Sequence, residues 1–123
     1  MTIDLSKHKY LLNCQDGANN VERATVSLIL GVTASKTSET AIFLTSDASY
    51  LGRKDGADGL QASGFEPLAD LLAQFVDQGG KIWLCKTCAK NKNIAEDDLI
   101  NGAEITGAPR PIEYLASGAH LLA

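Results

Sequence analysis

The sequence predicts an α/β protein of three layers, in which a mostly parallel five-stranded sheet carries helices on both faces. Short apolar segments alternate along the chain with segments of helical periodicity, a pattern typical of parallel strands joined by crossover helices. The segment at residues 40–45 contains no charged residue, as expected of a strand that is covered on both faces. Because 123 residues are enough for one hydrophobic core, we expect a single domain over residues 1–123.

The composition is that of an ordinary globular protein, and it argues against several function classes. Hydrophobic residues make up 45% of the chain and charged residues 21%, which is typical of soluble domains. The net charge of −4 argues against duplex nucleic acid as a partner. No apolar run approaches the length of a membrane span, and the first nine residues lack the hydrophobic core of a signal peptide. Three cysteines are a poor disulfide framework for a secreted protein, so the sequence predicts a cytoplasmic location.

The first elements are predicted to be a strand and a long helix. The strand should occupy residues 9–14 and be followed by a turn at residues 15–18. Asn19 is predicted to cap the helix, because Glu22 stands three residues later, at the spacing of a capping box. The helix should then run to about Ser35.

This helix has apolar residues on two sides. Its core stripe, at helical spacing, consists of Val21, Ala24, Leu28 and Val32. Val26 and Leu30 project from nearly the opposite side. A second apolar face predicts either a further layer of core or a contact between subunits.

The second predicted strand is followed by an unusually long connection. Residues 46–64 contain four glycines and few large apolar residues, so we expect a mobile segment with one helical turn near residues 48–51. It is either an irregular surface loop or a flap over a site. The next helix should begin at Pro67 and end before Gly79, because the apolar residues between them follow helical spacing.

The remaining elements are shorter. In order, we expect a strand at 82–84, the start of a short helix at 89–92, a helical turn at 96–98, a strand at 103–106, a helix at 109–116 and an edge strand at 119–122.

Two cysteines mark the junction between the third strand and the short helix. Backbone N–H groups at a helix start stabilise negative charge, and a thiolate is such a charge. Residues 81–92 contain no acid, and they contain the four basic residues Lys81, Lys86, Lys90 and Lys92. Because nearby cations lower the pKa of a thiol, the sequence predicts a reactive pair. Cys85 would be the more reactive nucleophile, and Cys88 would resolve its adduct.

The same junction resembles a known family. A strand that ends in Cys85, a second cysteine at Cys88, an Ala-Lys pair after it and Ile94 nine residues after the first cysteine together resemble the DsrE/DsrF-like family of small sulfur-relay proteins. Further similar stretches lie at residues 17–23, 43–45, 65–80 and 98–105. The resemblance therefore extends over nearly the whole chain, and it implies the same five-stranded layout.

The resemblance also implies roles for particular residues. Cys85 falls at the position of the family's persulfide-carrying cysteine, and Cys88 falls where one branch has a second cysteine. The family usually has glycine where this chain has Asn93, and asparagine also adopts the left-handed conformation. The implied partners are sulfur donor and acceptor proteins or small persulfides. The implied assembly is a homotrimer or homohexamer with cysteines near subunit contacts.

Three further residues are predicted to be accessory to the pair. Cys14 ends the first strand and would lie near Cys85 if the first and third strands were neighbours; otherwise it is a core cysteine. Lys86 lies between the two cysteines of the pair. Asn19 belongs to the turn at residues 16–19, which is either an anion cradle or a capped tight turn.

Other uses of the thiols are weaker alternatives. A structural zinc ion needs four ligands, whereas this chain has one CxxC motif and one further cysteine, so we expect no metal and no cofactor. A CxxC thiol–disulfide oxidoreductase is one alternative to sulfur relay. A non-catalytic oligomeric binding module with incidental thiols is another. Whether the protein is an enzyme, as a sulfurtransferase, or only a sulfur carrier stays open from the sequence.

Overall fold

The computed structural model describes residues 4–122 and contains one five-stranded sheet in which every strand pair is parallel. The strands are β1 (Lys9–Cys14), β2 (Glu39–Leu44), β3 (Lys81–Cys85), β4 (Ala103–Thr106) and β5 (Ala119–Leu122). Their spatial order is β4-β3-β2-β1-β5. The predicted α/β fold class is therefore confirmed, and the strands lie within one or two residues of their predicted positions.

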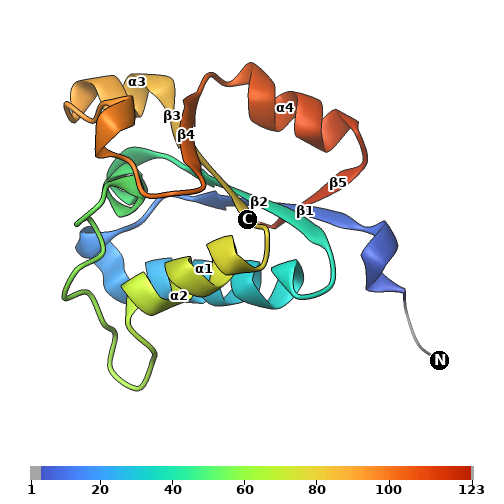
Figure 1. The fold of residues 1–123 in the computed structure, drawn as a ribbon, viewed down its shortest axis with the longest axis horizontal. Coiled ribbons are helices and arrows are strands. Elements are labelled where there is room, and N and C mark those ends of the chain that lie inside the picture. The colour runs from blue at the N-terminus through green and yellow to red at the C-terminus, as the bar shows by residue number, and fades with distance from the viewer. Residues whose placement is uncertain (1–3, 123) are drawn as a thin grey trace.

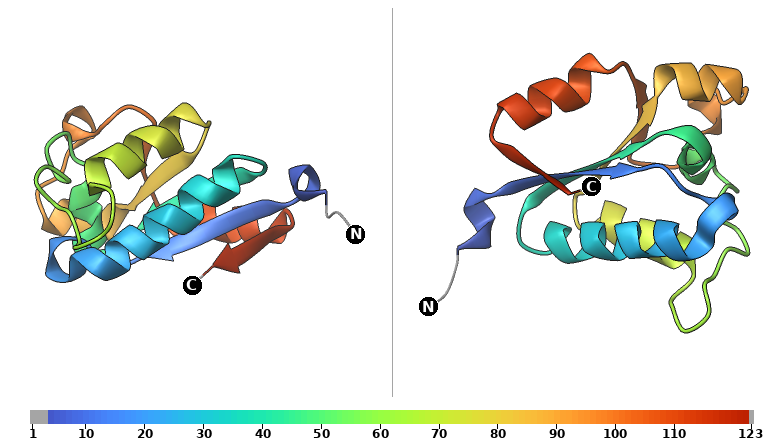
Figure 2. Two further views of the ribbon diagram at one scale, coloured as in Figure 1. Left: turned by 90° about the horizontal axis from the view of Figure 1, so that it is seen from below. Right: turned by 180° about the vertical axis from the view of Figure 1, so that it is seen from behind.

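Helices cover both faces of this sheet (Figure 1). The α-helices are α1 (Val21–Ser35), α2 (Leu68–Asp77), α3 (Lys86–Asn91) and α4 (Pro109–Ala116). The short 3₁₀ helices are η1 (Leu5–Lys7), η2 (Ala18–Asn20), η3 (Ser46–Gly52) and η4 (Glu96–Asp98). Figure 2 shows α1 and α2 side by side under one face, while α3 and α4 lie over the other. Within residues 4–122, none of the helices combines the length and the apolar character that crossing a membrane requires.

Successive residues of each strand point to opposite faces, which creates two cores. The larger core lies between the sheet and the helices α1 and α2, and it includes Leu12, Cys14, Leu28, Ile42, Leu44, Phe75, Ile82 and Leu84. The smaller core lies under α4 and consists of Leu11, Ala41, Trp83 and Tyr114. Here the rings of Trp83 and Tyr114 meet edge to face, with centroids 5.3 Å apart, a favoured aromatic geometry.

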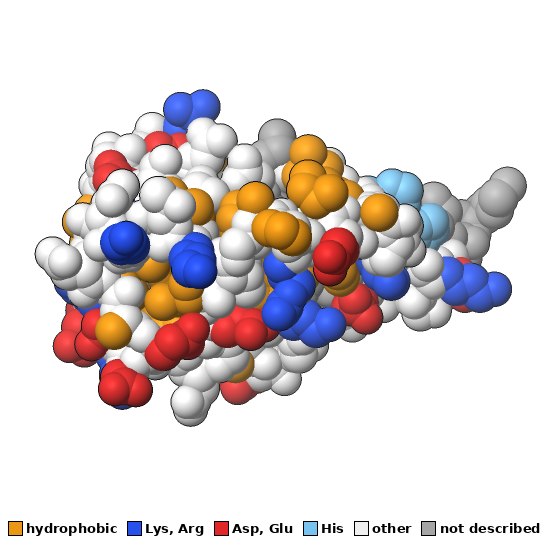
Figure 3. All heavy atoms as spheres, turned by 90° about the horizontal axis from the view of Figure 1, so that it is seen from above, with side chains coloured by type: hydrophobic (Ala, Val, Ile, Leu, Met, Phe, Trp, Pro, Cys, Tyr) orange, Lys and Arg blue, Asp and Glu red, His pale blue; other side chains and the backbone are white. Residues whose placement is uncertain are grey.

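The face with α3 and α4 is only partly covered. Figure 3, seen from this side, shows hydrophobic side chains gathered near the middle of the surface. On α4 and β5, Ile112 and Leu121 keep 63% and 57% of their surface exposed. This face therefore has a smaller buried core than the face under α1 and α2.

The start of α1 differs by one residue from the prediction. Asn20, not Asn19, is the capping residue, and its side chain accepts a hydrogen bond of 3.2 Å from the N–H of Arg23. Asn19 belongs to η2 and uses its side chain inside the preceding turn instead. Either of two consecutive asparagines could cap the helix. Asn19 already has hydrogen-bond partners in the preceding turn, so Asn20 is the cap.

The second apolar side of α1 lies on the surface. Val26 and Leu30 are 45% and 48% exposed, so the alternative of a further core layer is wrong. With Asn13 and Gln15, they line an open hollow of about 570 Å³.

The connection after β2 is more ordered than predicted. The helical turn expected near residues 48–51 is present as η3, in which Ala48, Ser49 and Leu51 are fully buried. This burial argues against a loosely held first half, and the mobility of residues 46–64 stays a prediction. The turn itself was predicted, but small side chains at this short spacing give too weak a periodic signal to predict that it is buried. The second half, residues 53–64, consists mainly of turns.

The short helix after β3 begins earlier than predicted. It was expected near residue 89, but α3 starts at Lys86, directly after the strand. Cys88 is therefore the third residue of the helix rather than a residue of the connection before it.

Candidate thiol site

The two cysteines of the CxxC motif lie together at the carboxyl end of β3. Cys85 is the last residue of the strand, and Cys88 lies in the first turn of α3. Both side chains are half-buried, and both are free thiols. The side chain of Cys85 shares the α4 side of the sheet with Trp83, because alternate residues of a strand share a face. The sequence-based prediction that the chain brings these two thiols to one place is thus realised in the fold.

The connection after β2 supplies a hydrogen-bond donor to this pair. Ser46 has a φ of +49°, in the left-handed region that residues with side chains rarely adopt. In this conformation its backbone N–H donates a hydrogen bond of 3.3 Å to Cys88 Sγ.

The same 3₁₀ helix carries a buried hydroxyl. Ser49, one turn further along η3, is fully buried, and its Oγ has no hydrogen-bond partner within residues 4–122. It favours the thiolate of Cys88 and so acts to lower the pKa of that thiol, although the two groups form no hydrogen bond in this structure.

The surroundings of Cys88 lower the pKa of its thiol. Burial acts in the opposite direction and is the largest single influence, but four favourable contacts outweigh it. In order of size, these are the thiol of Cys85, the N–H of Ser46, the charge of Lys92 and the hydroxyl of Ser49. Hydrogen bonds and positive charge favour the thiolate over the thiol. The thiol whose pKa the fold lowers is therefore Cys88, whereas the sequence pointed to Cys85 as the more reactive of the two.

Of the four lysines singled out in the sequence, only Lys92 acts on the thiol in this way. Its ammonium group also lies 5.6 Å from the ring centroid of Tyr50. Lys81 lies at the opposite end of β3, where it contacts Glu39 at 3.8 Å. Lys86 is exposed at the first position of α3, without an ion pair inside the described range. The expectation that all four form one field is therefore wrong for Lys81, because a strand of five residues separates it from the thiols.

Cys14 does not join the pair. The strand order places β2 between β1 and β3, so the strands that end in Cys14 and Cys85 are two spacings apart, about 10 Å. Cys14 also belongs to the larger core, on the other face of the sheet. Burial raises the pKa of its thiol to about 11. The expectation that Cys14 lies beside Cys85 is wrong, and the alternative of a core cysteine is the correct one.

Asn19 stabilises a tight turn rather than an anion site. Its side-chain amide donates to Asp16 Oδ1 at 2.9 Å, and its Oδ1 accepts from the N–H of Gly17 at 2.8 Å. These contacts occupy the Gly17 N–H and the side-chain amide of Asn19. Gly17 packs so closely on η3 that a Cβ atom there would lie 2.7 Å from the carbonyl oxygen of Asp47. Asn19 therefore holds the turn against which η3 packs.

Sequence analysis missed three residues of this region, namely Ser46, Ser49 and Thr106. Thr106 is the register partner of Cys85 on β4, and its Oγ1 is buried without a hydrogen-bond partner in the described chain. The available signal was their position, because ligands of parallel sheets gather at the carboxyl ends of the strands. Isolated serine and threonine residues add no motif to that signal.

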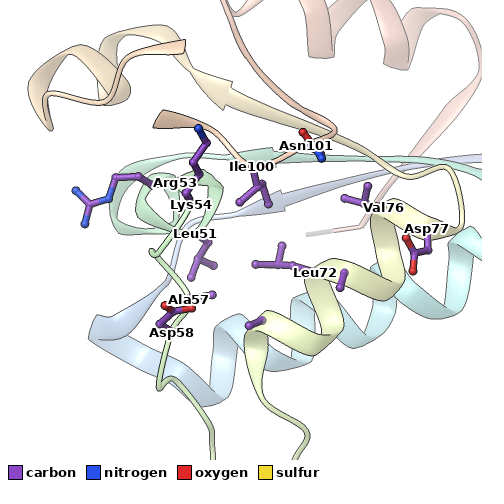
Figure 4. Close-up of a pocket in the computed structure, with 12 residues that line it drawn as sticks. Leu51, Arg53, Lys54, Ala57, Asp58, Leu72, Val76, Asp77, Ile100 and Asn101 are labelled. Carbon is purple, nitrogen blue, oxygen red and sulfur yellow. The ribbon is translucent and has the colours of Figure 1, made fainter. Parts of the chain in front are cut away.

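A separate hollow lies at the far end of η3 (Figure 4). It has a volume of about 360 Å³ and lies between η3, α2 and the segment before β4. Leu51, Leu72, Val76 and Ile100 form its apolar wall, and Arg53 and Lys54 lie at its rim. None of its lining residues is a cysteine, so this hollow is separate from the thiol pair.

Comparison with known proteins agrees with this architecture. The model of the DsrE/DsrF-like family matches residues 8–123. The chain is similar to the crystal structure of YchN from E. coli, with a TM-score of 0.78 and 23% identity over 94% of this chain and 97% of that one. It is also similar to MTH1491 of Methanobacterium thermoautotrophicum, with a TM-score of 0.69 and 12% identity over 94% and 98% of the two chains. At these identities the two structures show a shared fold.

Two curated sequences are also similar. The uncharacterised protein MJ0760 of Methanocaldococcus jannaschii is 33% identical over 101 residues, which cover 81% of this chain and 37% of that protein. The uncharacterised protein MK0008 of Methanopyrus kandleri is 33% identical over 85 residues, which cover 68% and 67% of the two chains. The aligned part of this chain thus spans little more than a third of the length of the first relative.

Proposed function

Because the chain belongs to the DsrE/DsrF-like family, we propose that it accepts sulfane sulfur as a persulfide on Cys85 and passes it on with the help of Cys88. The observation that supports this function best is the pair itself. Two free thiols lie at one strand end, and one of them is surrounded by groups that favour its thiolate. A thiolate is the form that attacks sulfur.

The transfer is a sulfur exchange in which no external oxidant is needed. A thiolate of the pair attacks the outer sulfur of a donor persulfide, R–S–SH. A new S–S bond forms, the S–S bond of the donor breaks, and the donor leaves as R–S⁻, which takes up a proton. Attack by an acceptor thiolate on the same outer sulfur regenerates the thiol. If Cys88 instead attacks the inner sulfur of a Cys85 persulfide, the products are a Cys85–Cys88 disulfide and hydrosulfide.

Mass spectrometry after incubation with glutathione persulfide tests this function. Trypsin cleaves after Lys86 and so separates Cys85 from Cys88 into different peptides. We expect one added sulfur on the Cys85 peptide of the wild type and none in the double variant Cys85→Ser with Cys88→Ser. Cys14→Ser is the matched control, because that thiol is buried away from the pair. Equal labelling of the double variant and the wild type would refute the proposal.

A CxxC thiol–disulfide oxidoreductase is the second candidate, favoured by the free Cys85–Cys88 pair itself. The spacing of the two cysteines permits a disulfide. This candidate predicts a Cys85–Cys88 bridge without added sulfur after exposure to oxidised glutathione, and reduction of a partner disulfide by the free pair. If the pair neither gains sulfur nor forms a disulfide in these experiments, the remaining candidate is a non-catalytic binding module.

The proposed role implies particular partners, an assembly and a cellular location. The donors and acceptors would be other sulfur-carrying proteins or small persulfides, and whether the protein turns over as a sulfurtransferase or only carries sulfur depends on them. A homotrimer or homohexamer fits the exposed apolar residues of α1. Free thiols fit the reducing cytoplasm.

A further inference from the structure

We propose that η3 holds the negative charge of the thiol pair on Cys88, through the Ser46 N–H and the Ser49 hydroxyl, and thereby directs the sulfane sulfur onto Cys85. This inference rests on the proposed function and adds a division of roles that the sequence does not contain. It treats Ser46 and Ser49 as positioning residues, which act on the reaction through Cys88.

The first support is the direction of the Ser46 N–H. A left-handed conformation at a serine destabilises the backbone locally. Here that conformation aims the N–H at Cys88 Sγ, 3.3 Å away. The preceding turn holds this start of η3 in place. Gly17 packs closely on Asp47, and the N–H of Ala48 donates a hydrogen bond of 3.3 Å to the carbonyl of Gln15.

The second, independent support is the buried hydroxyl of Ser49. A fully buried hydroxyl without a partner destabilises a fold, because it has lost its hydrogen bonds to water. Ser49 is 0% exposed and its Oγ is unpartnered in the described part of the chain. An alanine would fill this position without that disadvantage. The hydroxyl is accounted for if it donates to the sulfur of Cys88 when that sulfur is a thiolate.

The charge on Cys88 decides where the sulfur rests. In the exchange Cys88–S–SH + Cys85–S⁻ → Cys88–S⁻ + Cys85–S–SH, the S–S bond at Cys88 breaks and an equivalent bond forms at Cys85. Donors that stabilise the Cys88 thiolate stabilise only the right-hand side. They also make Cys88 the better leaving group. Sulfur that enters at the Cys88 thiolate is therefore passed to Cys85, which stores it.

The charged and titratable groups that act on Cys88 are Cys85 and Lys92. The charge of Lys92 is an alternative source of stabilisation of the Cys88 thiolate. Measurement at low and high salt distinguishes it from the hydrogen bonds of η3. The charge of Lys92 acts through solvent and is screened at about 1 M salt. A hydrogen bond from Ser46 or Ser49 is direct and should persist.

The first experiment measures the pKa of Cys88 from the rate of iodoacetamide alkylation against pH, without any sulfur donor. Cys88 should be alkylated first in the wild type, at low and at high salt. Ser49→Ala should raise the pKa of Cys88 and so lower its rate of alkylation at neutral pH several-fold. Because the Ser49 hydroxyl has no hydrogen-bond partner to lose, the Ser49→Ala protein should melt at the temperature of the wild type or above it. An unchanged pKa of Cys88 in Ser49→Ala would overturn the inference.

Two control variants have matched chemistry. Ser46→Gly retains the backbone N–H and allows the positive φ, so the pKa of Cys88 should not change. Ser35→Ala removes another buried serine hydroxyl, which donates to Val32 and accepts from Gln78; it should lower stability and leave the thiol unaffected. A rise in the pKa of Cys88 in Ser35→Ala as large as in Ser49→Ala would show that general destabilisation is the cause, and would refute the role of Ser49.

The second experiment locates the sulfur after incubation with glutathione persulfide. The wild type should retain the added sulfur on the Cys85 peptide, while Ser49→Ala should move a several-fold larger share to the Cys88 peptide. An unchanged distribution overturns the directing role. Absence of added sulfur from the wild type refutes the proposed function, whereas the alkylation experiment still decides whether η3 holds charge on Cys88.

Discussion

Two residues other than glycine have a positive φ in the described chain, Ser46 at +49° and Asn93 at +55°. The left-handed conformation of Asn93 was predicted from the sequence, because glycine is usual there in the family and asparagine is the next most tolerant residue. Ser46 was not predicted, because serine has no such preference and the turn is shaped by distant packing. A residue's own preference can be recognised in the sequence, but a conformation imposed by neighbours cannot.

Substitution of Asn93 should therefore distinguish backbone conformation from side-chain contacts. Asn93→Gly should leave stability unchanged or raise it by up to about 1 kcal/mol, because glycine adopts this conformation without strain. Asn93→Val should lower stability by roughly 1–2 kcal/mol, since a β-branched residue is strained there. Urea unfolding followed by circular dichroism measures both. Equal stability of the glycine and valine variants would contradict this reasoning.

Cys14 should make the protein less stable at alkaline pH. Burial raises its pKa from 9.0 to about 11 in the folded state, so the unfolded thiol ionises first. Its contribution to stability is complete below pH 9 and is lost as the pH rises through about 11, amounting to roughly 3 kcal/mol at the upper end. Urea unfolding of the wild type and Cys14→Ala across this range provides the test, since other titrating groups are common to both. Parallel curves for the two proteins would contradict the assignment.

At the scale of elements, the site depends on a contact between two turns that are far apart in the sequence. The turn at residues 16–19 and the start of η3 touch through Gly17 and the carbonyl of Asp47. The periodicity of α1 and α2 was predictable because each buries one regular stripe. The packing of η3 was not predictable, because it depends on the contact between Gly17 and Asp47 and on only a few buried side chains.

Gly17→Ala should displace η3. A Cβ atom at 2.7 Å from the Asp47 oxygen requires a backbone shift, which we expect to cost roughly 1–3 kcal/mol of stability and to slow alkylation of Cys88. Gly107→Ala is the matched control, because its Cβ atom would lie 3.4 Å from Pro109 in an ordinary contact. Thermal unfolding and alkylation rates provide the comparison. A Gly17→Ala protein with wild-type values in both would show that the two turns are not coupled.

At the scale of the whole molecule, the layers of the fold were predictable and the order of its strands was not. Alternation of strands and helices fixes a parallel sheet with helices on its faces. It does not determine which strands are neighbours, because pairing depends on contacts between distant segments. The prediction for Cys14 failed for this reason. The placement of Cys85 and Cys88 where a strand meets a helix needed only local spacing, and the fold shows it.

The outer side of α1 is the surface on which the assembly is predicted to depend. Burying the exposed halves of Val26 and Leu30 would contribute roughly 1–3 kcal/mol per subunit before the cost of association. Val26→Glu with Leu30→Glu should therefore reduce the mass measured by light scattering towards the 13.0 kDa of one chain, with helix content intact. Ala116→Glu, an exposed position on α4 over the other face of the sheet, should leave the mass unchanged. A wild type that scatters as a monomer at micromolar concentration would end this idea.

The position of β5 also has a consequence for how the chain folds. The first four strands are added one after another towards one edge of the sheet, but β5 returns to the opposite edge, where Lys9 pairs with Ala119. This pairing joins the two ends of the described chain, so it closes the longest loop and has the largest entropic cost of any strand pair. The segment from β1 to β4 can assemble through successive local units, whereas β5 has nothing to pair with until β1 is in place. We therefore expect docking of β5 to be the last step of folding and its release to be the first step of unfolding.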